Sequence, residues 1–176
     1  MKLILIGYRG TGKTTISDML SERLRMPVVH MDEVLEDRFA ERIASFVEKH
    51  GWEEFRNEES LLIDELAVAD NIIIDTGGGV VVRKRNIDLL KPDSFMVWLK
   101  AAPESIAFYI GRDVNRPSLT GTKSNVEEII EVLTERTPLY ESAADFQIRT
   151  DLAPLEECVE QIIKEWKKYN ETMETI

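Results

Sequence analysis

The sequence predicts a single α/β domain in which a parallel sheet lies between two layers of helices. Short apolar runs alternate along the chain with longer stretches that carry apolar residues at helical spacing. Most of the short runs are apolar at consecutive positions, as expected for strands that are buried on both faces. The 176 residues suffice for one hydrophobic core, and no repeat or linker divides them. These observations predict a three-layer α/β/α sandwich around a five-stranded parallel sheet.

The same pattern assigns the elements in chain order. Strands are expected at residues 3–6, 28–31, 72–74, 95–99 and 146–148. Helices are expected at residues 14–24, 52–67, 126–135 and 155–169. The polar segment 112–124, RDVNRPSLTGTKS, is expected to be a loop, and the residues after Trp166 are expected to fray.

Composition narrows the classes of function. The chain has 33 acidic and 22 basic residues, a net charge of −11, which is the wrong sign for a non-specific nucleic-acid or anionic-membrane binder. No apolar run approaches the roughly 18 residues that a membrane span requires, and the apolar start MKLILI is too short for a signal peptide. The single cysteine, Cys158, excludes an internal disulfide and is expected to be a buried helix residue. We therefore expect a cytoplasmic protein.

Residues 7–14, GYRGTGKT, match the pattern G-x-x-x-x-G-K-[ST] at all four fixed positions. An expected strand precedes the match and an expected helix follows it, as a phosphate-binding loop (P-loop) requires. Lys13 would supply positive charge to the β- and γ-phosphates, and the Thr14 hydroxyl would ligate Mg²⁺. A glycine-rich turn with an incidental lysine is the alternative. The motif predicts a nucleoside triphosphate site, whose ATP-binding residues are expected to include Gly10, Thr11, Gly12, Lys13, Thr14 and Thr15.

Five further short motifs follow the P-loop in order: HMD at 30–32, FRNEE at 55–59, TGGG at 76–79, RP at 116–117 and RTPLY at 136–140. Together with the P-loop they resemble the shikimate kinase family over nearly the whole chain. The resemblance implies a fold of the P-loop nucleoside monophosphate kinase type and Mg²⁺-dependent transfer of the ATP γ-phosphate to the 3-hydroxyl of shikimate, in aromatic amino acid biosynthesis. A related kinase of the gluconate or adenylate kinase type, and a non-catalytic nucleotide-sensing module, remain alternatives.

The resemblance also implies an acceptor site. Asp32 would hydrogen-bond the ring hydroxyls and accept the proton of the attacking one, although it could instead be an N-cap. Arg56 and Arg136 would bind the shikimate carboxylate through planar guanidinium donors. The alternatives are a surface helix charge for Arg56 and a helix-capping cation for Arg136. Close approach of the ring to bare backbone would explain the glycine run, Gly77, Gly78 and Gly79.

Within the single domain, residues 1–176, the resemblance implies a lid at about 112–124 and an acceptor-binding helical region at about 32–62. In the lid, Arg116 would join Lys13 in stabilising charge on the transferred phosphoryl group, and Arg112 would pack near adenine. Lid closure would exclude water. The expected partners are ATP and shikimate, with Mg²⁺ as cofactor, and the chain is expected to act as a monomer without nucleic acid or membrane.

Two positions depart from the family pattern. His30 stands where the family has the first Asp of a D-x-D motif near Mg²⁺, and imidazole is a poor substitute for a carboxylate there. Asp75, at the end of the third expected strand, is hypothesised to supply the metal-side carboxylate, the alternative being a strand-end residue that binds loop N–H groups. The segment TDLAP at 150–154 lacks an arginine that some members place over adenine. Adenine is therefore expected to be held more loosely or through the main chain.

Overall fold

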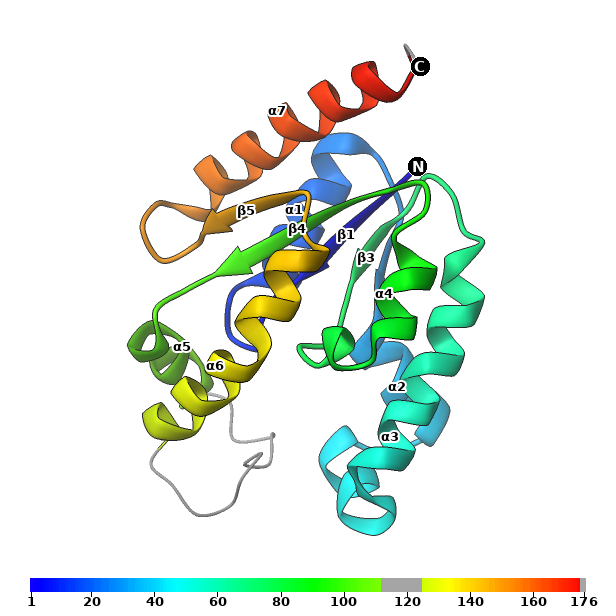
Figure 1. Cartoon of the computed structure of the whole chain (residues 1–176), viewed down its shortest axis with the longest axis vertical. Helices are drawn as coiled ribbons and strands as arrows, with labels where there is room; N and C mark the ends of the chain where they lie inside the picture. Colours follow the sequence, from blue (N-terminus) through cyan, green and yellow to red (C-terminus); the bar gives the residue numbers. More distant parts are fainter. Residues whose placement is uncertain (112–124, 175–176) are drawn as a thin grey trace.

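A computed structural model describes residues 1–111 and 125–174, and Figure 1 shows them as one sheet with helices on both faces. The spatial order of the strands is β2-β3-β1-β4-β5, and every neighbouring pair is parallel. This arrangement confirms the predicted sandwich. The strands are β1 (Lys2–Ile6), β2 (Val28–His30), β3 (Ile73–Asp75), β4 (Ser94–Lys100) and β5 (Phe146–Arg149).

The helices include four that the sequence predicts and three that it does not. The predicted ones are α1 (Lys13–Leu24), α3 (Ile43–Ala67), α6 (Asn125–Ala143) and α7 (Leu155–Glu174). The others are α2 (Met31–Phe39), α4 (Lys84–Leu90) and α5 (Pro103–Ile110), and a short 3₁₀ turn spans Val80–Val82. None of the helices in residues 1–111 and 125–174 is both long and apolar enough to cross a membrane. The expected loop at 112–124 lies outside the described residues.

Three helix boundaries differ from the prediction. Helix α6 continues to Ala143, eight residues beyond the predicted end at residue 135. Helix α7 continues to Glu174, so the expectation of fraying directly after Trp166 was wrong. Helix α3 begins at Ile43, nine residues before the predicted start, but Gly51 interrupts it with non-helical dihedral angles (φ 84°, ψ 165°). The predicted helix starting at residue 52 is therefore the part of α3 that follows the break. A positive φ suits glycine, which has no Cβ to clash with the backbone.

The core has two main halves, one on each face of the sheet, and a smaller third cluster that contains Tyr8, Ile106, Ile129 and Val132. Along β1, Leu3 and Leu5 pack with α1 and α7, whereas Ile4 and Ile6 pack with α3, α4 and α6. This alternation follows from the period of two in a strand, and it explains why residues 3–6 of β1 are all apolar. Cys158, on α7, is buried in the first half of the core, as predicted.

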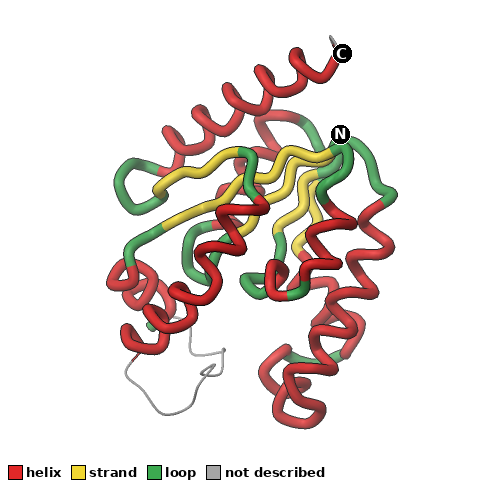
Figure 2. Tube along the Cα trace, viewed as in Figure 1, coloured by secondary structure: helices red, strands yellow, loops and turns green. Residues whose placement is uncertain are grey.

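The carboxyl ends of the strands place the functional motifs together. Figure 2 shows loops leaving the strands toward the same end of the sheet. The strand register sets His30, at the end of β2, beside Asp75, and sets Asp75 beside Leu5, two residues before the P-loop. The Thr150 hydroxyl, after β5, donates a hydrogen bond to the Thr11 carbonyl at 2.9 Å. Open parallel sheets bind ligands at this end.

Candidate active site

The P-loop follows β1 and turns sharply into α1. Gly10 and Gly12 adopt positive φ angles of 79° and 85°, which glycine tolerates without steric cost. The Lys13 ammonium is 3.0 Å from the carbonyl oxygen of Gly7 and 3.2 Å from that of Tyr8, so it lies across the loop. The loop therefore brings main-chain N–H groups, a helix N-terminus and a cation to one place, which is the arrangement that binds phosphate.

A first cavity, which we call the P-loop pocket, opens in front of this loop. The Thr11 side chain is buried and donates to the Tyr8 carbonyl at 2.8 Å, so only the main chain of Thr11 is available to a phosphate. The other P-loop residues predicted to bind ATP line the cavity. Its lining consists of Arg9, Gly10, Gly12, Lys13, Thr14, Thr15, His30, Asp32, Glu33, Asp75, Thr76, Tyr109 and Ile110.

Asp75 lies beside the P-loop threonine. Its Oδ2 accepts a hydrogen bond from the Thr14 hydroxyl at 2.8 Å and is 3.0 Å from Nδ1 of His30. The Nε2 atom of His30 is 3.0 Å from Asp18 Oδ1, so the imidazole bridges two carboxylates. Partial burial lowers the pKa of His30, but the hydrogen bond and charge of Asp75, with the charge of Asp18, together raise it above its ordinary value.

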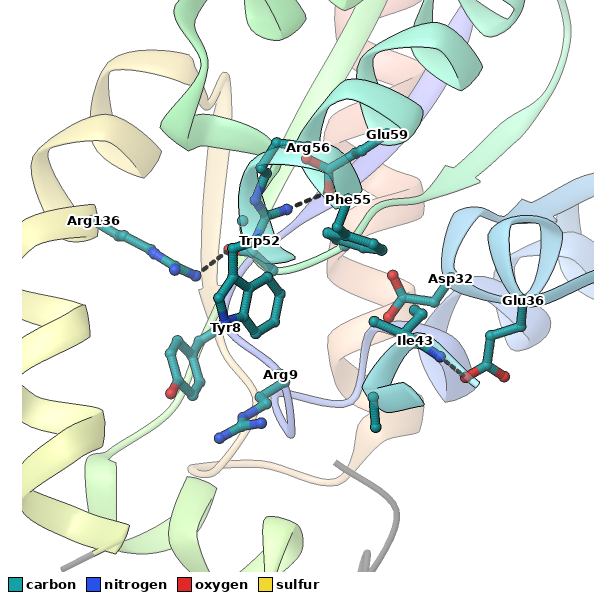
Figure 3. Close-up of a pocket in the computed structure, with 14 residues that line it drawn as sticks. Tyr8, Arg9, Asp32, Glu36, Ile43, Trp52, Phe55, Arg56, Glu59 and Arg136 are labelled. Atoms are coloured by element: carbon teal, nitrogen blue, oxygen red, sulfur yellow. Dashed lines mark hydrogen bonds and ion pairs between the residues drawn. The ribbon is translucent and has the colours of Figure 1, made fainter. Parts of the chain in front are cut away.

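A second cavity, which we call the arginine pocket, lies next to the first (Figure 3). It contains three guanidinium groups and three carboxylates, together with apolar side chains from α3. Every residue that was predicted to bind shikimate is described and lines this pocket. The full lining consists of Tyr8, Arg9, Asp32, Glu36, Ile43, Ala44, Trp52, Phe55, Arg56, Glu59, Gly77, Gly78, Gly79 and Arg136.

Arg56 is held in the arginine pocket by its own helix. Its Nη1 donates to Glu59 Oε1 at 2.7 Å, and its guanidinium carbon is 5.1 Å from the Phe55 ring and 5.5 Å from the Trp52 ring. Only 12% of the Arg56 side chain is exposed, so the alternative of a surface helix charge was wrong. Glu59 is 1% exposed; desolvation raises its pKa, while Arg56 acts in the opposite direction. The pair fixes the guanidinium before any ligand arrives.

Arg136 reaches the pocket from α6. Its Nη1 donates to the carbonyl oxygen of Gly78 at 3.1 Å, and the Tyr140 hydroxyl donates to the same oxygen. These two side chains lie four residues apart and therefore share a helix face. Burial raises the pKa of Tyr140 to about 12, so its hydroxyl remains a donor at neutral pH. Arg136 lies well inside α6, so the helix-capping alternative was wrong.

The three consecutive glycines each allow a different close approach. A Cβ on Gly79 would lie 2.0 Å from Arg56 Nη2. One on Gly77 would lie 2.9 Å from Glu59 Oε1 and 3.0 Å from Asp32 Oδ1, and one on Gly78 would lie 3.1 Å from the Arg9 backbone nitrogen. None of the three has a positive φ. The run is therefore required for packing against site residues rather than for unusual backbone angles.

Within residues 1–111 and 125–174, Asp32 and Arg9 are the two residues that line both cavities. Asp32 lies in the first turn of α2, whose N-cap is His30, so the alternative that Asp32 is the N-cap was wrong. A carboxylate at the border of a phosphate site and an acceptor site is placed to take a proton from the attacking group. Arg112 and Arg116 fall outside the described residues.

Several lining residues were not predicted. Trp52 and Glu59 lie four residues before and three residues after Arg56, so helical spacing alone could have indicated that they share its face. Tyr8 and Arg9 occupy variable positions of the P-loop pattern, and no sequence signal assigned them to a ligand. Glu36 accepts a hydrogen bond from the Ile43 backbone N–H at 3.0 Å, which ties α2 to the start of α3 (Figure 3).

Comparisons with known proteins agree with this geometry. The family model described as "Shikimate kinase" matches residues 9–167. A shikimate kinase from Dehalococcoides mccartyi is 33% identical over 97% of this chain and 96% of its own length, and one from Thermodesulfovibrio yellowstonii is 37% identical over 94% and 95%.

Solved structures agree as well. Shikimate kinase from Acinetobacter baumannii, in complex with shikimate, has a TM-score of 0.89 and 27% identity, covering 96% of this chain and 93% of its own. A gluconokinase from Sinorhizobium meliloti, at 13% identity over 99% of this chain and 95% of its own, has a TM-score of 0.64 and shares the fold alone. With its P-loop, its pair of pocket arginines and a family model that spans nearly its whole length, this chain belongs to the shikimate kinase family.

Proposed function

We infer that this chain catalyses transfer of the γ-phosphate of ATP to the 3-hydroxyl of shikimate, as a step in aromatic amino acid biosynthesis. The observation that carries this inference is that the P-loop pocket and the arginine pocket adjoin and share Asp32. A donor phosphate in the first pocket and a carboxylated acceptor in the second would meet beside that carboxylate. Phosphoryl transfer depends mainly on such positioning and on charge stabilisation.

On the nucleotide side, the P-loop N–H groups and Lys13 would hold the β- and γ-phosphates. The Thr14 hydroxyl and the Asp75 carboxylate supply neighbouring oxygen donors, which are the ligand type that Mg²⁺ prefers. Mg²⁺, when bound, would neutralise charge on the phosphates. We propose that Arg116 adds a further cation at the transferred group and that Arg112 lies near adenine.

On the acceptor side, Arg56 and Arg136 would bind the carboxylate of shikimate. Each guanidinium carries five N–H donors, and the contacts to Glu59 and to the Gly78 carbonyl leave donors for a ligand. Gly79 leaves room for the Arg56 guanidinium beside the backbone. Asp32 would then orient the 3-hydroxyl and take its proton.

We further propose that residues 1–176 form one kinase domain, with a lid at about 112–124 and an acceptor-binding region at about 32–62. We propose that the chain acts as a monomer. The requirement for ATP supports a cytoplasmic location. The net charge of −11 disfavours nucleic-acid or membrane partners.

Arg56→Ala and Arg136→Ala are each expected to weaken shikimate binding by about 10-fold to 100-fold, because each removes a charge-assisted contact to the carboxylate. ATP affinity is expected to change by less than about threefold, since neither side chain lines the P-loop pocket. Calorimetric titration with each ligand would measure both. Arg85→Ala, an exposed arginine paired with Asp64, serves as the control. Equal losses for nucleotide and acceptor would contradict the assignment.

Asp75→Asn is expected to raise the Mg²⁺ concentration required for half-maximal rate by about 10-fold, because it removes a charged oxygen donor beside Thr14. The matched control is Asp18→Asn, which also takes a carboxylate away from His30 but lies outside the P-loop pocket. A Mg²⁺ titration of the initial rate would measure the shift. If Asp75→Asn left the Mg²⁺ concentration for half-maximal rate unchanged, Asp75 would be a structural residue at the end of β3 and not a metal ligand.

The proposed activity itself is tested by ADP release in a coupled assay, with ATP and either shikimate, gluconate or AMP as acceptor. Of the three acceptors, we expect only shikimate to support turnover. Faster turnover with gluconate or AMP would assign the chain to a different acceptor. If none of the three acceptors led to ADP release, a non-catalytic module would be favoured. Omitting the acceptor measures any background ATP hydrolysis.

A further inference from the structure

Arg9 occupies a variable position of the P-loop, yet its side chain is nearly buried, with 12% exposed. It lines both the P-loop pocket and the arginine pocket, a property that, among the described residues, only Asp32 shares. In Figure 3 its side chain extends from the P-loop away from Asp32, on the side of Tyr8. The junction of the two cavities therefore has a carboxylate from α2 on one side and a guanidinium from the P-loop on the other.

The Arg9 guanidinium contacts residues that lie outside the motifs FRNEE (55–59) and RTPLY (136–140). Its Nη2 is 3.5 Å from Oε1 of Glu128, whose side chain is 3% exposed in the first turn of α6. The guanidinium carbon lies 5.9 Å from the centre of the Tyr8 ring. Glu128 is absent from the lining of both pockets, so its contact with Arg9 is a route by which it can act on a ligand.

A buried ion pair contributes little to stability, because the desolvation of both charges offsets their attraction. The place of Arg9 at the junction indicates a ligand contact instead. The group that moves through this junction is the phosphoryl group, and a guanidinium binds phosphate oxygens bidentately. Arg56 and Arg136, in contrast, line only the arginine pocket.

Resting on the proposed function, we propose that Arg9 binds the transferred phosphoryl group from the acceptor side and stays in contact with it in the phosphorylated product. Glu128 is a positioning residue that keeps the guanidinium at the junction. Arg9 would therefore distinguish the product from the unphosphorylated acceptor, and Lys13 would hold the phosphates from the nucleotide side.

The proposal is tested by calorimetric titration of the nucleotide-free protein with shikimate and with shikimate 3-phosphate. Arg9→Met is expected to weaken binding of shikimate 3-phosphate by about 10-fold or more and binding of shikimate by less than about threefold. Arg9→Lys should recover part of the loss, since it keeps the charge but not the fork of donors. Equal losses for the two ligands, or no loss for the phosphate ester, would overturn the proposal.

The Glu128→Gln variant tests the positioning role. We expect it to weaken binding of shikimate 3-phosphate in the wild-type background and to have no effect in the Arg9→Met background, because its effect passes through Arg9. The same loss in both backgrounds would overturn this role. If Arg9→Met alone does not fold, the Arg9→Met/Glu128→Gln variant, which removes both charges, gives the same comparison of ligands.

Failure of this proposal can be separated from failure of the proposed function. If the wild-type protein phosphorylates shikimate but Arg9→Met binds the product normally, only the assignment of Arg9 is lost. If the wild-type protein neither binds nor phosphorylates shikimate, both proposals fall together.

Discussion

Lys13→Ala is expected to lower the rate of phosphoryl transfer by about 10³-fold, because it removes a preorganised cation from the phosphates. The ammonium already lies within the P-loop, at 3.0 Å from the Gly7 carbonyl oxygen, and is 8% exposed. The rate would be measured as ADP release at saturating ATP and shikimate. Circular dichroism would show whether the fold is kept. Lys13 donates hydrogen bonds to the Gly7 and Tyr8 carbonyls within the P-loop and is not a member of the apolar core clusters.

Lys84→Ala is the control, because Lys84 is an exposed lysine whose partner is Asp88 on the same helix. A second variant, Lys13→Met, keeps most of the apolar stem and separates loss of charge from loss of packing. Near-normal turnover in either Lys13 variant would mean that this P-loop is not the catalytic nucleotide site.

Asp32→Asn is expected to lower kcat by about 10²-fold to 10³-fold, because an amide cannot accept the proton of the attacking hydroxyl. Shikimate affinity is expected to fall by less than about fivefold, since Asn can still hydrogen-bond a hydroxyl. Steady-state kinetics and a binding titration would give the two quantities separately.

Glu33→Gln is the matched control for Asp32→Asn, because Glu33 follows in the same turn of α2 and lines only the P-loop pocket. A loss of shikimate affinity with unchanged kcat in Asp32→Asn would reduce Asp32 to a binding residue. An equal loss of kcat in both variants would point to a general effect of charge on the nucleotide.

The sheet was predictable from the sequence because strands buried on both faces are apolar at consecutive positions, as at residues 3–6 of β1 and 95–99 of β4. The short helices were not. Helix α4 has seven residues and α5 has eight, which is too short for an apolar period to emerge. Helix α2 begins directly at the end of β2 with no separating turn, so its start carried no loop signal.

The candidate site was predictable where a motif names a side chain, as for Lys13, Arg56 and Arg136. The contacts that hold these side chains in place were not predictable, because they join elements that are distant in the sequence. Nothing local to Gly79 indicates that a Cβ there would strike Arg56. The pairing of Arg9 with Glu128 likewise joins the P-loop to α6 across more than a hundred residues. The hypothesis that Asp75 is a metal ligand stays a prediction.

The most direct test of the central claim is to identify the product of the reaction. The purified protein would be incubated with ATP, Mg²⁺ and shikimate, and the ester located by two-dimensional ³¹P–¹H NMR spectroscopy. The two adjoining pockets predict one product, with phosphorus coupled to the ring proton at the 3-position and an equal amount of ADP. A phosphate ester at another hydroxyl, or ADP formed with inorganic phosphate and no ester, would contradict the account.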